Sequence, residues 1–446
     1  MRKSLLLSGA TAIMLGIALL TSCEGPQGAM GPAGKDGTDG TDGVDGVDAN
    51  ETCKECHNPA SVDLISAQYE FSKHGYGEAA FEEAGNTGCS PCHVSEGFKD
   101  VVDRNVPSTF TLVGQSYVND YACSSSTAYG ELVCNTCHSS IHTTYTDQDI
   151  AAFTTVEPVS MTMWGGAKTI DLTVDGNGSS NLCVKCHQPR PFTNSNTDKN
   201  VLDYDNLVSN PTDTFYAATN PSGPNVLKPG YRTHTHYGTV GAIFAGKGGI
   251  EFDGTLSYSS SQHNSQTTCS DCHQAPMNGR AGGHTFFAKG NFNGCVDCHP
   301  NLTSSTSDPA HWGDKRTEIQ TLLNQLAASL TVGGIDILNR NPDTESNLWV
   351  GLTTNKYDGY LNIYDPVNNP DGLTNNPTGP FKNPSPGNSW TQAQKDFNNT
   401  LTPIVLTNAQ MGAIINFQMC LREYSLGVHN FNYSKALLTN SLAVLD

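Results

Sequence analysis

Hydrophobic positions form a continuous run at one end of the chain and a helical pattern at the other. Residues 5–20 are mostly apolar and follow the basic Arg2 and Lys3, which is the arrangement of an export signal. No later run reaches the ~20 apolar residues that a membrane-spanning helix needs. A multi-pass membrane protein is therefore excluded.

The apolar spacing after residue 312 predicts three helices. The first covers residues 319–330. A Thr-x-x-Gln capping box opens the second, at residues 407–421, and the third has its apolar face at residues 433–442. Residues 340–390 are rich in Asn, Pro and Gly and predict a long loop. We expect residues 313–446 to be a small helical support without haem motifs, packed on the rest of the protein.

The composition leaves few side chains for an ordinary core. Hydrophobic residues make up 37% of the 446 residues and charged residues 15%, against roughly 45–50% (counted with Gly) and about 25% in ordinary domains. Another source of buried apolar surface is needed, or much of the chain is loop. The net charge of −19 argues against a nucleic-acid partner, because phosphate binding needs a basic face.

The export signal ends in Leu-Thr-Ser-Cys at residues 20–23, which resembles the bacterial lipobox. We expect residues 1–22 to be a lipoprotein signal peptide and Cys23 to carry the lipid that anchors the protein to a membrane; an ordinary secretory signal is the alternative. Residues 23–50 have glycine at every third position, which is collagen-like, and become rich in aspartate. They predict a flexible tether, with a trimerising stalk as the alternative.

Fifteen cysteines provide the most specific signal, because twelve belong to six Cys-x-x-Cys-His motifs. The motifs are Cys53/Cys56/His57, Cys89/Cys92/His93, Cys134/Cys137/His138, Cys183/Cys186/His187, Cys269/Cys272/His273 and Cys295/Cys298/His299. A shuffled chain would hold roughly 0.016 copies, so chance does not explain six. Two thiols on one side of a helical turn can bond one porphyrin edge, and the next histidine can bind its iron. Zinc sites would pair the Cys-x-x-Cys units and need no fixed histidine. We predict six covalently attached haem c groups.

Eight histidines lie outside the motifs, enough to give every haem iron a second axial ligand. Seven of them are our candidates: His74, His142, His234, His236, His263, His284 and His429. We expect only one of His234 and His236 to bind iron, and His311 is the weakest candidate. His138 and His142 would share one face of a helix and could bind two neighbouring haems.

Two cysteines remain once the motifs and Cys23 are assigned. Cys123 and Cys420 either form a disulfide that joins the C-terminal region to the motif region or stay as two buried thiols.

The six motifs, Thr-His-Tyr-Gly at 235–238, Gly-Gly-His-Thr-Phe at 282–286 and Gly-Val-His-Asn at 427–430 resemble exported bacterial multihaem cytochromes c. The resemblance covers residues 51–446 and implies that His284 and His429 are distal ligands. The catalytic Cys-x-x-Cys-Lys of pentahaem nitrite reductases is missing from the sequence. We expect residues 51–312 to be a hexahaem domain of loops and short α-helices, with little β-structure, wrapped around a stacked chain of haems.

The expected function is electron transfer along bis-histidine haems at the cell surface, outer membrane or outside the cell. Partners would be other redox proteins or extracellular electron acceptors, and polymerisation into a filament is a variant. The alternative is a reductase for nitrite, hydroxylamine or a sulfur oxyanion, with one five-coordinate haem and no catalytic residue that the sequence identifies. A structural surface protein that uses haem only as core is the third candidate.

Overall fold

The computed structural model describes most of the chain after residue 52. The described residues are 53–54, 56–76, 89–104, 110–113, 116–119, 130–145, 147–173, 179–190, 192, 202–217, 229–230, 233–340, 357–363, 379–383 and 390–446. Residues 52–446 form one compact unit. The predicted signal peptide and tether, as well as Cys123, lie outside the described residues.

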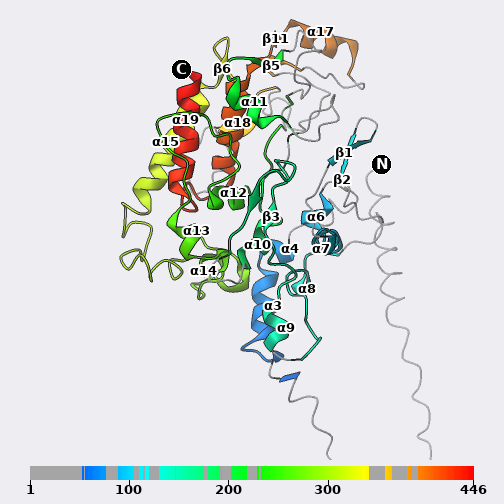
Figure 1. Cartoon of the computed structure of the whole chain (residues 1–446), viewed down its shortest axis with the longest axis vertical. Helices are drawn as coiled ribbons and strands as arrows, with labels where there is room; N and C mark the ends of the chain where they lie inside the picture. The colour runs from blue at the N-terminus through cyan, green and yellow to red at the C-terminus, as the bar shows by residue number, and fades with distance from the viewer. Residues whose placement is uncertain are drawn as a thin grey trace, which may run out of the picture. The chain divides into compact units, whose positions relative to one another are not determined.

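Short helices carry the motif-bearing part of the chain (Figure 1). They are α3 (Val62–Glu70), α4 (Lys73–Tyr76), α6 (Ser90–His93), α7 (Ser95–Arg104), α8 (Cys134–Cys137), α9 (Asp147–Ala151), α10 (Ser179–Val184), α11 (Tyr204–Ser209), α12 (Val240–Ala245), α13 (Gln262–Gln266), α14 (Cys269–His273) and the 3-10 turn η1 (Gly283–Thr285). The later helices are α15 (Gly313–Ser329), α17 (Gln392–Thr400), α18 (Asn408–Arg422) and α19 (Phe431–Leu445). None of these described helices is long and apolar enough to cross a membrane.

The strands of the described residues form six separate two-stranded sheets. Five are antiparallel: β1 (Phe110–Val113) with β2 (Ser116–Asn119), β3 (Val159–Ser160) with β4 (Thr169–Ile170), β5 (Thr214–Ala217) with β12 (Val405–Thr407), β6 (Thr331–Val332) with β7 (Ile335–Asp336), and β8 (Leu338–Arg340) with β9 (Tyr357–Leu361). β10 (Phe381–Lys382) and β11 (Thr402–Pro403) pair in parallel. The expectation of short helices with little β-structure is confirmed.

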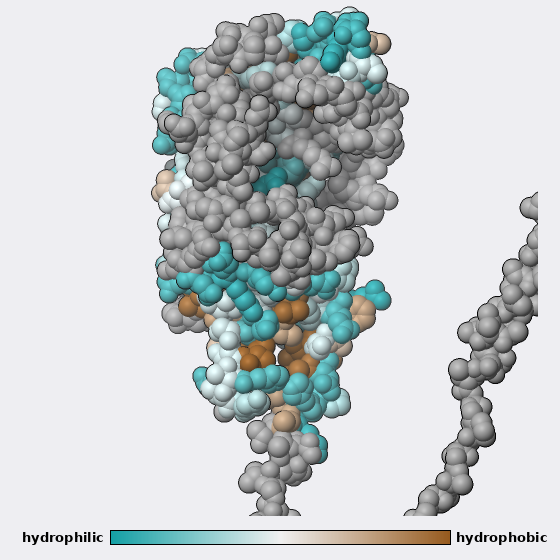
Figure 2. All heavy atoms as spheres, turned by 90° about the vertical axis from the view of Figure 1, so that its right-hand side faces the viewer, coloured by the Kyte–Doolittle hydropathy of each residue, from teal (hydrophilic) through white to brown (hydrophobic). Residues whose placement is uncertain are grey.

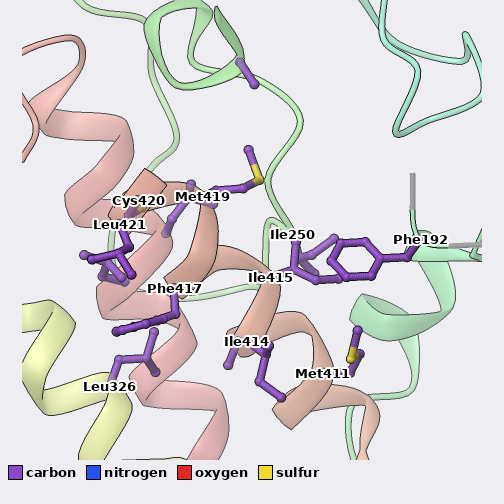
Figure 3. Close-up of a cluster of buried hydrophobic side chains, with 14 of the residues drawn as sticks. Phe192, Ile250, Leu326, Met411, Ile414, Ile415, Phe417, Met419, Cys420 and Leu421 are labelled. Carbon is purple, nitrogen blue, oxygen red and sulfur yellow. The ribbon is translucent and has the colours of Figure 1, made fainter. Parts of the chain in front are cut away.

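Helix α18 is the centre of the main hydrophobic core. Its N-terminus has the predicted capping box: the Thr407 hydroxyl accepts from the Gln410 N–H at 3.2 Å, and the Gln410 side chain accepts from the Thr407 N–H at 3.0 Å. It is buried on nearly every side and packs against α15 and α19. In Figure 3, Leu326 of α15 lies beside Phe417, and Ile250 and Phe192 lie on the other side of the cluster. The three helices predicted after residue 312 are therefore confirmed.

Two features of this region differ from the prediction. The segment expected to be a long loop contains β9 and β10, and β9 alternates buried and half-buried residues from Tyr357 to Leu361. That short alternation was hidden among Asn, Pro and Gly. The region after residue 312 is also more than a support, because it supplies most of the core cluster; the rest comes from between Val159 and Phe252.

Candidate functional site

The motif-bearing part of the protein surrounds a cavity of about 2520 Å³. All twelve motif cysteines and all six motif histidines line it. Ordinary small-molecule pockets measure about 300–1,000 Å³, and this cavity provides about 420 Å³ for each of the six motifs. Figure 2 shows hydrophobic residues set between polar ones in the lower part of the molecule. The space is too large for one ligand and suits several.

Each motif folds into a helical turn that brings its two thiols to one side, as predicted. In five motifs the histidine N–H donates to the carbonyl of the first cysteine: His57 to Cys53 (2.7 Å), His93 to Cys89 (3.1 Å), His138 to Cys134 (2.9 Å), His187 to Cys183 (2.9 Å) and His299 to Cys295 (2.7 Å). The fifth motif along the chain is itself the helix α14. We number the sites 1 to 6 by the order of these motifs.

Each motif histidine lies near a histidine from outside the motifs. The ring centroids of five pairs are 5.9–6.3 Å apart: His57–His142 (5.9 Å), His93–His236 (6.1 Å), His187–His74 (5.9 Å), His273–His429 (6.3 Å) and His299–His263 (6.2 Å). At site 3 the candidate is His284, whose pKa is lowered by burial and then by the charge of His138. Five motif histidines thus have five different partners, and His284 is the candidate for the sixth.

This spacing fits two imidazoles bound to opposite sides of one metal ion. A metal–imidazole bond is about 2.0 Å long and the ring nitrogen lies about 1.15 Å from the ring centre, so trans ligands have centroids about 6.3 Å apart. The measured values of 5.9–6.3 Å match that separation. A flat macrocycle held by the two thiols of each motif would fit between the rings.

Hydrogen bonds leave the Nε2 atom of several rings available to a metal. His273 Nδ1 donates to the Phe286 carbonyl at 2.8 Å, and His263 Nδ1 donates to the Val428 carbonyl at 2.9 Å. His429 Nδ1 donates to a Glu423 carboxylate oxygen at 2.5 Å. Fixing the proton on Nδ1 orients the ring and selects the tautomer whose Nε2 lone pair can bind a metal.

Burial also keeps these imidazoles neutral. Burial, followed by the charge of neighbouring histidines, lowers the pKa of His187 to about 3. Burial, followed by the charge of Arg190, lowers the pKa of His236 to about 3. The pKa values of His74, His263 and His273 are lowered by burial as well. Only a neutral imidazole can bind a metal, so this environment favours ligation near neutral pH.

Thiols of different motifs lie together. No disulfide joins the cysteines that the structure describes. Cys92 of site 2 and Cys186 of site 4 lie close enough for each to shift the pKa of the other, and so do Cys183 of site 4 and Cys269 of site 5. Groups attached to these thiols would therefore be close neighbours. The motif cysteines do not form a cluster that could hold a metal ion. Among the described residues, the only group of three possible ligands is His299, Asp308 and His311. Zinc clusters built from the motifs find no support.

Two histidines lie outside the pairing. His234, one of our candidate ligands, does not line the cavity. Its Nδ1 lies 2.8 Å from Arg422 Nη1 and accepts the His236 N–H at 2.8 Å, so His236 is the member of this pair that faces a motif histidine. His311 has a side chain 61% exposed and pairs with Asp308 at 2.9 Å, although its ring also lies 5.2 Å from that of His299.

His138 and His142 do not share the face of a helix that their four-residue spacing suggested. Helix α8 ends at Cys137, and His142 adopts a left-handed backbone with φ of 62°. His138 is the motif histidine of site 3, whereas the ring of His142 lies beside that of His57 at site 1. The irregular turn between them therefore replaces the helical face that the four-residue spacing suggested.

Two further residues near the site had no signal in the sequence. Arg422 and Glu423, at the end of α18, bond His234 and His429. Cys420, which the sequence left as a disulfide partner or a buried thiol, is a buried free thiol whose Sγ lies 3.9 Å from the Ser434 carbonyl. Polar residues in the last turn of a helix are common, so only the tertiary structure reveals their contacts.

No known protein family, curated protein or solved structure matches this chain. Its function therefore has to be inferred from the residues of the site.

Proposed function

We propose that this chain is a six-haem c-type cytochrome that transfers single electrons between neighbouring haems. The observation that carries the proposal is the meeting of five motif histidines with five different histidines from outside the motifs, at ring-centroid separations of 5.9–6.3 Å. When bound, haem iron cycles between Fe(III) and Fe(II) and so holds or releases one electron.

The residues of the chain would divide the work at each site. Two cysteine thiols fix one edge of the macrocycle, and the motif histidine binds one face of the iron. The partner histidine binds the opposite face and excludes small ligands from it. Compared with methionine–histidine ligation, two histidines lower the reduction potential.

Contacts between the sites connect all six. The thiols link sites 2, 4 and 5, and the charge of Cys137 at site 3 raises the pKa of Cys186 at site 4. His138 and His142 belong to sites 3 and 1, separated by only four residues. His263 lies just before the site 5 motif and serves site 6. An electron could therefore enter at one site and leave at another.

The reductase alternative requires one iron with an open coordination position. Five motif histidines already have a partner and the sixth has a candidate in His284, which favours electron transfer over substrate reduction. A ligand from a second copy of the chain is not needed for the same reason. We keep surface anchoring through Cys23 and delivery to extracellular acceptors as part of the proposal.

The test is to produce the chain in a bacterial host that attaches haem c. Haem should be counted per chain, and the dithionite-reduced protein exposed to CO. We expect six haems and no CO-induced shift of the Soret band. A shift in about one-sixth of the haem would support the reductase. Protein without covalent haem would contradict the proposal altogether.

A further inference from the structure

Two adjacent residues at the end of α18 bring opposite charges to different sites. Arg422 and Glu423 are each only 2% exposed, so water screens their charges little. Glu423 bonds the partner histidine of site 5. Arg422 Nη1 lies 2.8 Å from His234 Nδ1, which also accepts the N–H of His236, the partner histidine of site 2, at 2.8 Å. Thiols of site 4 lie beside thiols of site 2 and of site 5. The difference in charge between sites 5 and 2 therefore acts along a connected row of sites.

Glu423 is held as a carboxylate by three donors. His429 Nδ1, the Ser425 hydroxyl and the Gly427 N–H donate to it at 2.5, 2.6 and 3.0 Å. Although burial alone would raise its pKa, these hydrogen bonds and the charge of His429 lower the pKa of Glu423 overall. Arg316 lies near enough for the two charges to interact, and its Nε donates to the Ser425 carbonyl at 3.3 Å.

The contact of His429 with a carboxylate sets site 5 apart from site 6. His263, the partner histidine of site 6, donates its Nδ1 proton to a neutral backbone carbonyl, and so does His273, the motif histidine of site 5 itself. A carboxylate that accepts the Nδ1 proton makes the imidazole a stronger donor to its metal and so stabilises the more highly charged Fe(III) state. Such a site is harder to reduce.

Site 2 has the opposite environment. Arg190 lines the same cavity as His236, and its backbone N–H donates to the carbonyl of the adjacent Thr235 at 2.9 Å. After burial, the charges of Arg190 and Arg422 are among the causes that lower the pKa of His236. Arg422 donates to the backbone carbonyl of Asp358 at 3.4 Å, whereas the Asp358 carboxylate accepts from Asn339 Nδ2 at 2.7 Å and from the Tyr360 N–H at 2.9 Å. A positive charge beside a haem stabilises Fe(II).

We propose that Glu423 makes the haem at site 5 harder to reduce while Arg190 and Arg422 make the haem at site 2 easier to reduce, so that electrons shared along sites 5, 4 and 2 collect at site 2. The inference rests on the proposed function. Glu423 is a positioning and tuning residue that acts through His429. Its charge would set the direction in which electrons move along sites 5, 4 and 2.

The test is a redox titration of the haem-loaded chain followed by electron paramagnetic resonance. Ferric haems with near-parallel imidazole planes give rhombic spectra, and perpendicular planes give highly anisotropic ones. The ring planes are 12° apart at site 5 and 29° apart at site 1, but 75° apart at site 2. The signals therefore separate site 5 from site 2.

Glu423→Gln removes the charge and keeps an oxygen that can accept the Nδ1 proton. We expect the midpoint potential of one rhombic signal to rise by at least about 59 mV. For a one-electron couple, this shift is a tenfold change in the reduced-to-oxidised ratio. Glu318→Gln is the matched control. Glu318 on α15 forms a half-exposed ion pair with Lys435 on α19, so the substitution removes the same charge away from the six sites. It should leave every potential unchanged.

Arg190→Gln is the second variant, at a half-buried position that does not depend on the folding of α18. It should lower the midpoint potential of an anisotropic signal. Unchanged potentials in either variant, with six haems still attached, would overturn the inference. Loss of haem from the unmodified chain would instead refute the proposed function, so the two failures are distinguishable.

Discussion

Replacing His142 by glycine tests the pairing of histidines directly. His142 is the partner of His57 at site 1, with ring centroids 5.9 Å apart. Its φ of 62° lies in the left-handed region, where glycine is free of the strain that alanine would add. His142→Gly therefore removes the imidazole with little disturbance of the backbone.

The size of the effect follows from the one-to-one pairing. Five pairs keep both imidazoles, and one iron loses its distal ligand, so about one-sixth of the haem should bind CO after reduction. Tyr145 stacks on His142 at 5.8 Å and could approach the ferric iron through its oxygen. CO binds ferrous iron, for which a phenol is a poor ligand, so the reduced protein still reports the vacancy.

The assay is a CO titration of the dithionite-reduced protein, read as the fraction of the Soret band that shifts and normalised to six haems per chain. His311→Ala is the control, since His311 is exposed and pairs with Asp308. It should bind no CO. If His142→Gly retained six haems and bound no CO, His142 would not be the ligand. A shift in two-sixths would mean that it serves two sites.

Four other outcomes follow from the structure. Electron paramagnetic resonance of the oxidised protein should show rhombic signals from the pairs with plane angles of 12° and 29° and anisotropic ones from the pairs at 75°, 76° and 84°. Leu437→Ala in the buried face of α19 should lower the free energy of unfolding by about 2–5 kcal/mol, measured with urea. Thr407→Ala should cost about 1 kcal/mol in the same assay, because the α18 cap is lost. Burial lowers the pKa of His187 to about 3. Between that value and the unfolded pKa of about 6.5, only the unfolded state takes up a proton, so the free energy of unfolding should fall by up to about 1.4 kcal/mol per pH unit as the pH is lowered. Acid titration followed by circular dichroism measures this fall.

Local chemistry was predictable from the sequence, because each motif is a self-contained helical turn. The cap at Thr407 and the helices of the C-terminal region were predictable for the same reason, since their signals lie within a few residues. Seven candidates for the second ligands could be named from residue type alone. Which one meets which motif could not be named, because the meeting of His273 with His429 depends on how α18 and α19 pack.

The errors also have physical causes. His234 and His236 have the same residue type and nearly the same neighbours, and only the contact of His234 with Arg422 separates them. β9 has an alternating pattern too short to stand out from its surroundings. The shortage of apolar residues suggested that no ordinary core exists, yet one forms around α18, because its buried residues are gathered from distant segments.

If the protein is the proposed cytochrome, the two histidines of each pair would be reached at different stages of its biogenesis. Thiol attachment of haem would need only five consecutive residues, so it could occur on a nascent, extended polypeptide. The second histidine arrives only when remote segments meet: His57 must find His142, and His273 must find a residue near the C-terminus. Each such bond closes a long loop and removes conformational freedom from the chain, as a cross-link does. Maturation would then be at risk from exchange among eight chemically equivalent imidazoles, and a misligated intermediate would have to release a histidine before the native partner could replace it.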